Sequence, residues 1–184
     1  MSSPSFSLCV YCGARPGKNP AYEAAGTALG EAIAAEGWRL VYGAGDVGIM
    51  GAVAAAAVGN GAHSLGVIPT HLLQSEAPRD LYGSDRIITE TMHERKKVMF
   101  MNADAVAVLP GGAGSLDEFF EVLTWAQLGL HAKPVFLVDV EGYWQPLVGL
   151  IDHVVSEGFA DASVKDLFRV VPDVPALVAA LRAA

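Results

Sequence analysis

The sequence has few charged residues, only two cysteines and no long apolar run. Charged residues make up 17% of its 184 residues, below the roughly 25% that is usual in soluble domains. Hydrophobic residues make up 52%, which excludes an intrinsically disordered chain. The mean hydropathy is +0.37, but charges or glycine-rich turns interrupt the apolar stretches before the roughly 18 residues that a membrane span needs. We therefore expect no membrane association.

Positive charge is scarce as well. Twelve Lys and Arg stand against twenty Asp and Glu, which gives a net charge of −8. Proteins that bind nucleic acid or an anionic membrane through counterion release need the opposite balance, so neither is an expected partner. A bound phosphate would have to be held locally, by backbone amides and a few well-placed cations.

The two cysteines, Cys9 and Cys12, indicate no metal site and no disulfide. No histidine lies at metal-ligand spacing from them, and residues i and i+3 of a strand point to opposite faces. We interpret both as packing thiols in a reducing compartment. The first residues, Met-Ser-Ser-Pro-Ser, lack the basic region of a secretory signal. A cytoplasmic location is expected.

Short β-branched runs alternate with helix-length stretches along the whole chain. The predicted strands are Ser7–Cys12, Arg39–Tyr42, Ser64–Ile68, Arg86–Thr89, Ala105–Leu109, Pro134–Val138 and Phe168–Val171. The predicted helices are Pro20–Glu36, Ile49–Asn60, His93–Asn102, Ser115–Gly129, Tyr143–Glu157 and Val174–Ala183. This pattern predicts an α/β fold, a doubly wound parallel sheet with helices on both faces. We expect one Rossmann-like nucleotide-binding domain over residues 1–184.

Three glycine-rich loops follow predicted strands, where ligands bind in such sheets. They are Gly13–Gly17, Gly43–Gly51 and Pro110–Glu118. The second matches the dinucleotide pattern G-x-G-x-x-G, but the acidic residue expected after the next strand is replaced by Pro69 and Thr70. It is therefore interpreted as a tight turn lining a pocket, with an NAD(P)-dependent oxidoreductase kept as an alternative.

The third loop, Pro110–Glu118, indicates a ligand more specifically than the second loop does. Its glycines let backbone amides converge where a helix begins, which makes an anion site suited to one phosphate. It lacks the Lys-Ser/Thr ending of a Walker A loop. A structural interpretation competes: Ser115 and Glu118 have the spacing of a capping box. Glu121 lies one turn further along the same face.

A basic cluster opens the helix before the fifth strand, in Met92-His-Glu-Arg-Lys-Lys97. Such a run is commonly a solvated face. In this acidic chain, however, Arg95 and Lys96 could neutralise a phosphate or orient a carboxylate. Composition leaves both interpretations open.

Taken together, these segments resemble the Lonely Guy (LOG) family of cytokinin riboside 5′-monophosphate phosphoribohydrolases, long mislabelled lysine decarboxylases. Pro110-Gly-Gly-Ala-Gly-Ser-Leu-Asp-Glu118 looks like the family motif PGGxGTxxE. Further matching segments are Val10-Tyr-Cys-Gly13, Gly43–Gly51, Ile68-Pro69, Met92-His-Glu-Arg-Lys96, Thr124-Trp-Ala-Gln-Leu-Gly129 and Lys133-Pro-Val. Ser115 replaces the usual Thr, and Ala44 and Asp46 depart from a loop that is often all glycine.

The resemblance implies hydrolysis of the N-glycosidic bond of an N6-modified adenosine 5′-monophosphate, or of AMP, without metal or organic cofactor. It implies Arg95 and Glu118 as the catalytic pair, and a homodimer with the site near the interface. The helices holding Met92–Met101 and Phe119–Trp125 are the expected contact. The nucleotide would be bound by Glu76, Arg95, Lys96, Gly111, Gly112, Ala113, Gly114, Ser115, Leu116, Asp117 and Thr124, to which spacing adds Glu121. A non-catalytic nucleotide-binding module on the same fold is the main alternative.

Overall fold

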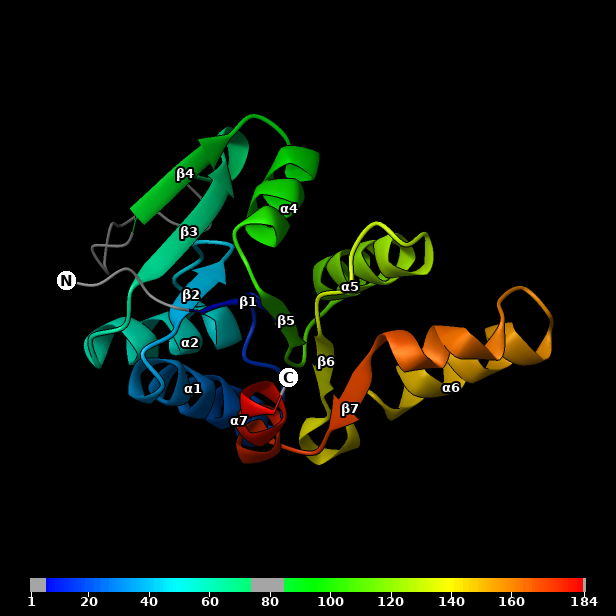
Figure 1. Ribbon diagram of the computed structural model, residues 1–184. Coiled ribbons are helices and arrows are strands. Elements are labelled where there is room, and N and C mark those ends of the chain that lie inside the picture. The colour runs from blue at the N-terminus through cyan, green and yellow to red at the C-terminus, as the bar shows by residue number, and fades with distance from the viewer. Residues whose placement is uncertain (1–5, 74–84, 184) are drawn as a thin grey trace.

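The computed structural model describes residues 6–73 and 85–183, whose centre is one parallel sheet of seven strands in the order β4-β3-β2-β1-β5-β6-β7 (Figure 1). The strands are β1 (Ser7–Tyr11), β2 (Arg39–Tyr42), β3 (Ser64–Pro69), β4 (Asp85–Thr89), β5 (Ala105–Val108), β6 (Val135–Val138) and β7 (Arg169–Val171). Neighbouring strands pair in parallel. The predicted doubly wound α/β fold is confirmed.

Helices cover both faces of the sheet. They are α1 (Pro20–Ala35), α2 (Gly48–Gly59), α4 (Met92–Met101), α5 (Ala113–Gln127), α6 (Gln145–Ser156) and α7 (Val174–Arg182). Three short 3₁₀ turns, η1 (Thr70–Leu72), η2 (Val140–Gly142) and η3 (Ala162–Leu167), complete the described elements. One face carries α1, α2 and α7, and the other carries α4, α5 and α6 (Figure 1). None of the described helices combines the length and apolar character needed to cross a bilayer.

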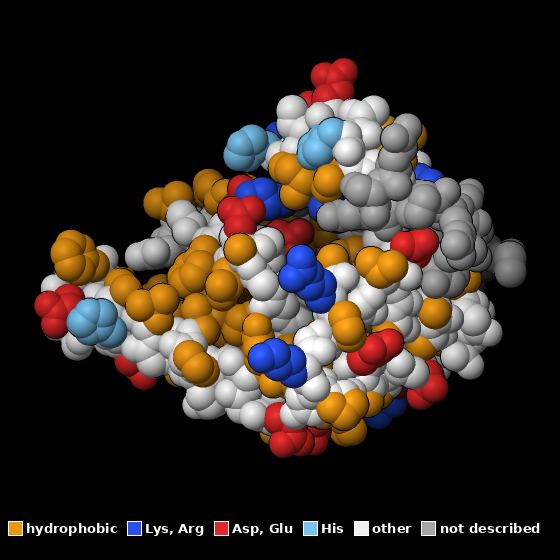
Figure 2. All heavy atoms as spheres, turned by 180° about the vertical axis from the view of Figure 1, so that it is seen from behind, with side chains coloured by type: hydrophobic (Ala, Val, Ile, Leu, Met, Phe, Trp, Pro, Cys, Tyr) orange, Lys and Arg blue, Asp and Glu red, His pale blue; other side chains and the backbone are white. Residues whose placement is uncertain are grey.

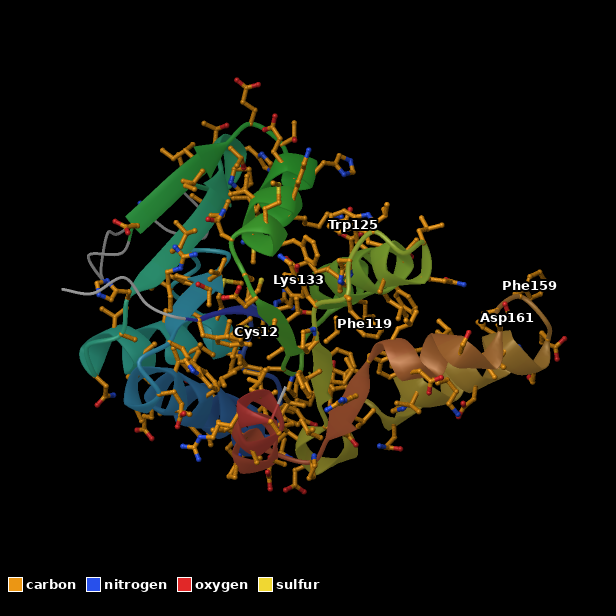
Figure 3. All side chains as sticks on the ribbon, in the orientation of Figure 1. Cys12, Phe119, Trp125, Lys133, Phe159 and Asp161 are labelled. Carbon is orange, nitrogen blue, oxygen red and sulfur yellow. The ribbon has the colours of Figure 1, made fainter. Side chains whose placement is uncertain are left out.

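Alternation along β1 divides the core into two layers. Leu8 and Val10 belong to the hydrophobic cluster beneath α1, α2 and α7. Cys9 and Tyr11 belong to the cluster beneath α4, α5 and α6, where Phe119 lies between α5 and α6 (Figure 3). Cys9 and Cys12 fall into different clusters, and both are buried free thiols as predicted.

The strand order reverses beside β1. From β1 the chain continues outward through β2, β3 and β4, and it then returns to place β5 against the other edge of β1. Ligands of open α/β sheets bind in the crevice at such a switch point, outside the carboxyl ends of the strands. Here those ends carry the loops that begin at Gly13 and Pro110.

The predicted elements are all present, with boundaries shifted by no more than two residues. One shift matters: α5 begins at Ala113, with Gly112 as its N-cap and no side-chain capping bond. Ser115 therefore lies inside the first turn, and the capping box suggested for Ser115 and Glu118 is wrong. The extended backbone of Gly112, with φ −97° and ψ −152°, lets the helix begin earlier. A capping box does form at α4, between Thr91 and Glu94.

Candidate active site

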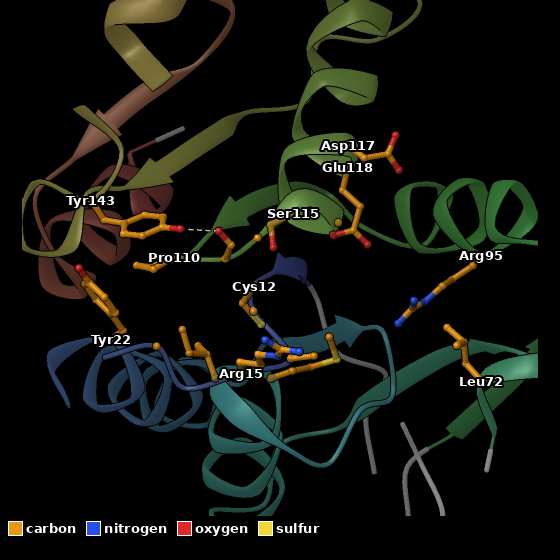
Figure 4. A pocket seen from close by; sticks show the side chains of 18 of the residues that line it. Cys12, Arg15, Tyr22, Leu72, Arg95, Pro110, Ser115, Asp117, Glu118 and Tyr143 are labelled. Atoms are coloured by element: carbon orange, nitrogen blue, oxygen red, sulfur yellow. Dashed lines mark hydrogen bonds between the residues drawn. The ribbon is translucent and has the colours of Figure 1, made fainter. Parts of the chain in front are cut away.

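A cavity of about 480 Å³ opens at the switch point of the sheet (Figure 4). Its wall includes the loop after β1, the start of α2, the side chain of Arg95 from α4, and the glycine loop that leads into α5. This volume falls within the range of roughly 300–1,000 Å³ that is usual for small-molecule sites.

Backbone contacts lock the three glycine loops together. The N–H of Gly13 donates to the carbonyl oxygen of Pro110 at 3.0 Å, and the N–H of Met50 donates to the carbonyl oxygen of Gly13 at 3.2 Å. Gly48 has a φ of +62°, and a Cβ placed there would lie 2.5 Å from the nitrogen of Arg15. Glycine is required at this point both for space and for conformation. The glycines of the second loop therefore serve close backbone packing.

The start of α5 presents backbone donors at the cavity. Its first helical hydrogen bond runs from the N–H of Leu116 to the carbonyl oxygen of Gly112. The N–H groups that precede it have no intrahelical acceptor, as at every helix N-terminus, and Gly112, Gly114 and Ser115 line the cavity. Together with the positive end of the helix dipole, they can bind an anion.

Tyr143 fixes this loop from the side. Its hydroxyl donates a hydrogen bond of 2.5 Å to the carbonyl oxygen of Gly111 (Figure 4). The Tyr143 ring also meets the ring of Tyr22 edge-on, with centroids 5.2 Å apart. Both tyrosines line the cavity.

Glu118 is half-buried and lines the cavity one helical turn beyond Ser115. Figure 4 shows its side chain directed from α5 into the cavity, across from Arg95. Burial raises the pKa of the Cys12 thiol far above its ordinary value, and the negative charge of Glu118 adds to the shift. Cys12 also lines the cavity. It stays protonated at neutral pH, so it does not act as a thiolate nucleophile there.

Arg95 is 4% exposed and is held by backbone carbonyl groups. Its Nε donates to the oxygen of Val67 at 3.1 Å, and its Nη2 donates to the oxygen of Gly43 at 2.7 Å. A Cβ at Gly43 would lie 2.0 Å from that Nη2, so the first glycine of the second loop makes room for the guanidinium. The contacts fix a cation at the cavity wall.

Lys96 points to a different set of partners. Its Nζ lies 2.9 Å from Asp117 Oδ2 and 3.2 Å from Glu121 Oε1. Burial by itself lowers the pKa of Lys96, but the hydrogen bonds and charges of the two carboxylates outweigh it and raise the pKa. The basic run at the start of α4 is thus divided, because Arg95 and Lys96 are buried while His93 and Lys97 are exposed.

The structure separates the predicted site residues into two groups. Those that line the cavity are Arg95, Gly111, Gly112, Gly114, Ser115, Asp117 and Glu118. Those outside its lining are Lys96, Ala113, Leu116, Glu121 and Thr124; the Thr124 hydroxyl donates to the carbonyl oxygen of Phe120 at 2.7 Å. Glu76 lies outside the described residues. Asp46, which distinguishes the second loop, is also absent from the lining.

Sequence reasoning missed several lining residues. Arg15, Tyr22 and Tyr143 carry polar groups, and Ile49, Met50, Leu72 and Met92 supply apolar surface. The sequence could have indicated Arg15, since it lies in the first glycine loop, which follows a predicted strand. It could not have indicated Tyr143, because Tyr143 lies 32 positions from Gly111 and only the fold brings the two together. Among the described residues, no cluster of His, Cys, Asp and Glu suits a metal ion.

A family model and curated relatives from two plants match this chain and agree with one another. A family model described as "possible lysine decarboxylase" matches residues 50–181. The chain is 45% identical over 171 residues to a probable cytokinin riboside 5′-monophosphate phosphoribohydrolase of Oryza sativa subsp. japonica, covering 93% of this chain and 75% of that protein. It is 43% identical over 171 residues to a cytokinin riboside 5′-monophosphate phosphoribohydrolase of Arabidopsis thaliana, covering 93% and 78%.

A solved structure with a similar fold is the molybdenum cofactor binding protein from Rippkaea orientalis. The TM-score is 0.71 at 21% sequence identity, and the match covers 98% of each chain. At this identity the likeness establishes the fold alone.

Proposed function

Because the chain belongs to the family of the cytokinin riboside 5′-monophosphate phosphoribohydrolases, we propose that it hydrolyses the N-glycosidic bond of adenosine 5′-monophosphates. The products are the free base, adenine or an N6-substituted cytokinin, and ribose 5-phosphate. One observation carries the proposal. A carboxylate, Glu118, enters the same cavity as the N-terminus of its own helix, one turn away.

This spacing suits a nucleoside monophosphate. One helical turn rises about 5.4 Å, which is similar to the length of the ribose between a 5′-phosphate and the glycosidic carbon. With the phosphate at the amides of Gly112–Ser115, the glycosidic bond falls near Glu118. The N–H groups and the helix dipole then balance the phosphate charge locally.

The chemical role of Glu118 follows from the transition state. Glycosidic cleavage builds positive charge on the ribose, and an ionised carboxylate stabilises that charge or activates the attacking water. Arg95 would act from the opposite wall, where its guanidinium is already oriented by Gly43 and Val67. It can hold the Glu118 carboxylate or the substrate in place. No metal or organic cofactor takes part in this proposal.

The lysines do not fit lysine decarboxylation. That chemistry uses pyridoxal phosphate, bound to a lysine as a Schiff base, and such a lysine is activated by a lowered pKa. Lys96 next to the cavity has a raised pKa and is held by two carboxylates. Burial does lower the pKa of Lys133, but its Nζ donates to the carbonyl oxygens of Phe100 and Ala103 and it lines a different cavity.

The test is to incubate the protein with AMP and with isopentenyl-AMP and to look for free base by chromatography. We expect base and ribose 5-phosphate in equal amounts. Tight binding of AMP without release of base would instead identify a nucleotide-binding module. Binding of NAD(P), measured separately, in a protein that neither binds AMP nor releases base would favour the oxidoreductase alternative.

We also propose a homodimer that is formed through α4 and α5. Large apolar side chains are exposed on these helices and just after them: Met101 at 67%, Leu128 at 67% and Leu130 at 69%. On the face that Figure 2 draws, hydrophobic side chains also gather beside the arm that contains α6. Burial of such a surface between two copies is the usual basis of a stable dimer. Sedimentation at micromolar concentration tests this, and a stable 19.2 kDa species would contradict it.

The chain would act as one nucleotide-binding domain over residues 1–184, and the protein would be cytoplasmic. Two buried free thiols support a reducing compartment. Cell fractionation of the tagged protein tests the location.

A further inference from the structure

Arg15 contributes a cation to the cavity from the loop between β1 and α1. The residue is exposed and lines the cavity. Figure 4 shows its side chain on the wall that faces the start of α5 and Ser115. It therefore stands opposite the backbone donors of α5.

The backbone at Arg15 is held beside the third glycine loop, which leads into α5. A Cβ at Gly48 would lie 2.5 Å from the Arg15 nitrogen, and one at Gly13 would lie 3.0 Å from the Arg15 oxygen and 3.4 Å from the Cα of Gly111. Three loops thus meet at this point, and they leave no space for a side chain at Gly13 or Gly48. This packing fixes the backbone of Arg15 relative to the start of α5.

The charges around the cavity leave Arg15 with a distinct role. Asp117 and Glu118 bring negative charge to the lining. The positive charge of Lys96 is balanced by two carboxylates, and Arg95 is bound to two backbone carbonyl groups. Across residues 6–73 and 85–183, no carboxylate forms an ion pair with Arg15. A phosphate dianion that enters beside two carboxylates needs a cation of this kind.

We propose that Arg15 binds the 5′-phosphate of the substrate, on the side opposite the amides of Gly112–Ser115. A guanidinium can give two parallel N–H donors to two phosphate oxygens. The phosphate is then enclosed between a helix N-terminus and a side-chain cation. This inference rests on the proposed function, because it takes the anion to be the phosphate of a nucleotide.

The test compares Arg15→Gln with Lys18→Gln. Both variants remove one positive charge from the same loop, but Lys18 is exposed and outside the cavity lining. Binding of ribose 5-phosphate, AMP and adenosine is measured by calorimetry on each protein, with AMP titrated in a Glu118→Gln background so that it is not hydrolysed during the measurement. For Arg15→Gln, we expect ribose 5-phosphate and AMP to bind about tenfold to a hundredfold more weakly, while adenosine binding stays as in the wild type. Lys18→Gln should bind all three as the wild type does.

Arg15→Lys refines the test, because it keeps the charge and loses the paired donors. Its affinity for ribose 5-phosphate should lie between those of the wild type and Arg15→Gln. Equal losses for AMP and adenosine would overturn the proposal in favour of a contact with the base or ribose. Equal effects of Arg15→Gln and Lys18→Gln would reduce it to a general charge effect, and unchanged binding in Arg15→Gln would also overturn it.

The measurements separate this inference from the proposed function. If the wild type releases no base but Arg15→Gln still weakens ribose 5-phosphate binding, the hydrolase proposal fails and the phosphate contact stands. If the wild type hydrolyses AMP and Arg15→Gln binds phosphates normally, only the role of Arg15 fails. A wild type that binds none of the three ligands contradicts both.

Discussion

The hydroxyl of Tyr143 donates to the carbonyl oxygen of Gly111 at 2.5 Å. In a trans peptide the C=O and the following N–H point in opposite directions, and the structure has no cis peptide bond among its described residues. By holding the Gly111 carbonyl, Tyr143 therefore directs the N–H of Gly112 the other way. The bond connects the turn before α6 to the orientation of the glycine loop that we propose to bind the phosphate.

Tyr143→Phe should accordingly weaken phosphate recognition while keeping the aromatic contact with Tyr22. We expect KM for AMP to rise by about threefold to tenfold, since one hydrogen bond is lost, with kcat nearly unchanged. Turnover of adenosine, which has no phosphate, serves as the internal control. Equal loss of activity on AMP and adenosine would assign Tyr143 a purely structural role.

Glu118→Gln is the sharpest test of the catalytic assignment. Glutamine keeps the shape of the side chain and removes its charge, so turnover should fall by about two to four decades while AMP affinity and Tm stay close to the wild type. Turnover and affinity should be measured on the same preparation. Glu121→Gln provides a comparison, since Glu121 pairs with Lys96 outside the cavity lining. Near-normal turnover in Glu118→Gln would move the catalytic role to another residue.

The 5′-phosphate should dominate substrate choice. Removing it leaves the amides at the start of α5 without their anion, at a cost of about 3–6 kcal/mol, or roughly two to four decades in kcat/KM. The measurement is turnover of AMP against adenosine at equal enzyme concentration. Similar rates for the two would exclude an anion site at Gly111–Ser115.

Gly43→Ala should displace Arg95, because the new Cβ would lie 2.0 Å from its Nη2. We expect a loss of about 1–3 kcal/mol in stability, as for other overpacked buried sites, together with a large drop in turnover. Gly59→Ala is the control, since a Cβ at Gly59 meets nothing within 4 Å. Urea unfolding and turnover are measured on both. Full activity in Gly43→Ala would show that the position of Arg95 is not critical.

Because of the ion pairs of Lys96, the free energy of unfolding should change with pH in the alkaline range. Their net effect raises the pKa of Lys96 above 10.5, so the folded state binds this proton more tightly than the unfolded state does. The stabilisation is therefore fully present below the unfolded-state pKa and is lost as pH rises through the folded-state pKa. The difference in unfolding free energy between the wild type and Lys96→Met should stay constant up to about pH 10, and it should shrink between about pH 10 and about pH 12. A constant difference over this range would contradict the assignment.

The sequence by itself determined the order of elements and the class of site. Apolar runs of strand length, such as Ala105–Val108, have to be buried on both faces, which requires a parallel sheet with helices on either side. Glycine clusters at the ends of these runs predicted where the backbone comes close to a ligand. Glu118 and Arg95 could be selected early because their motifs are local in the sequence.

Only the tertiary structure decided how the charges are shared. Arg95 and Lys96 are adjacent in one basic run, yet one faces the cavity and the other pairs with Asp117 and Glu121. Arg15 and Tyr143 join the site through contacts between distant loops, and α5 begins before Ser115 because Gly112 adopts an extended conformation. Local patterns set which residues can form a helix or strand, whereas the partner of a side chain depends on which segments the sheet order brings together. That order fixes distances between residues far apart in the chain, and no local spacing encodes them.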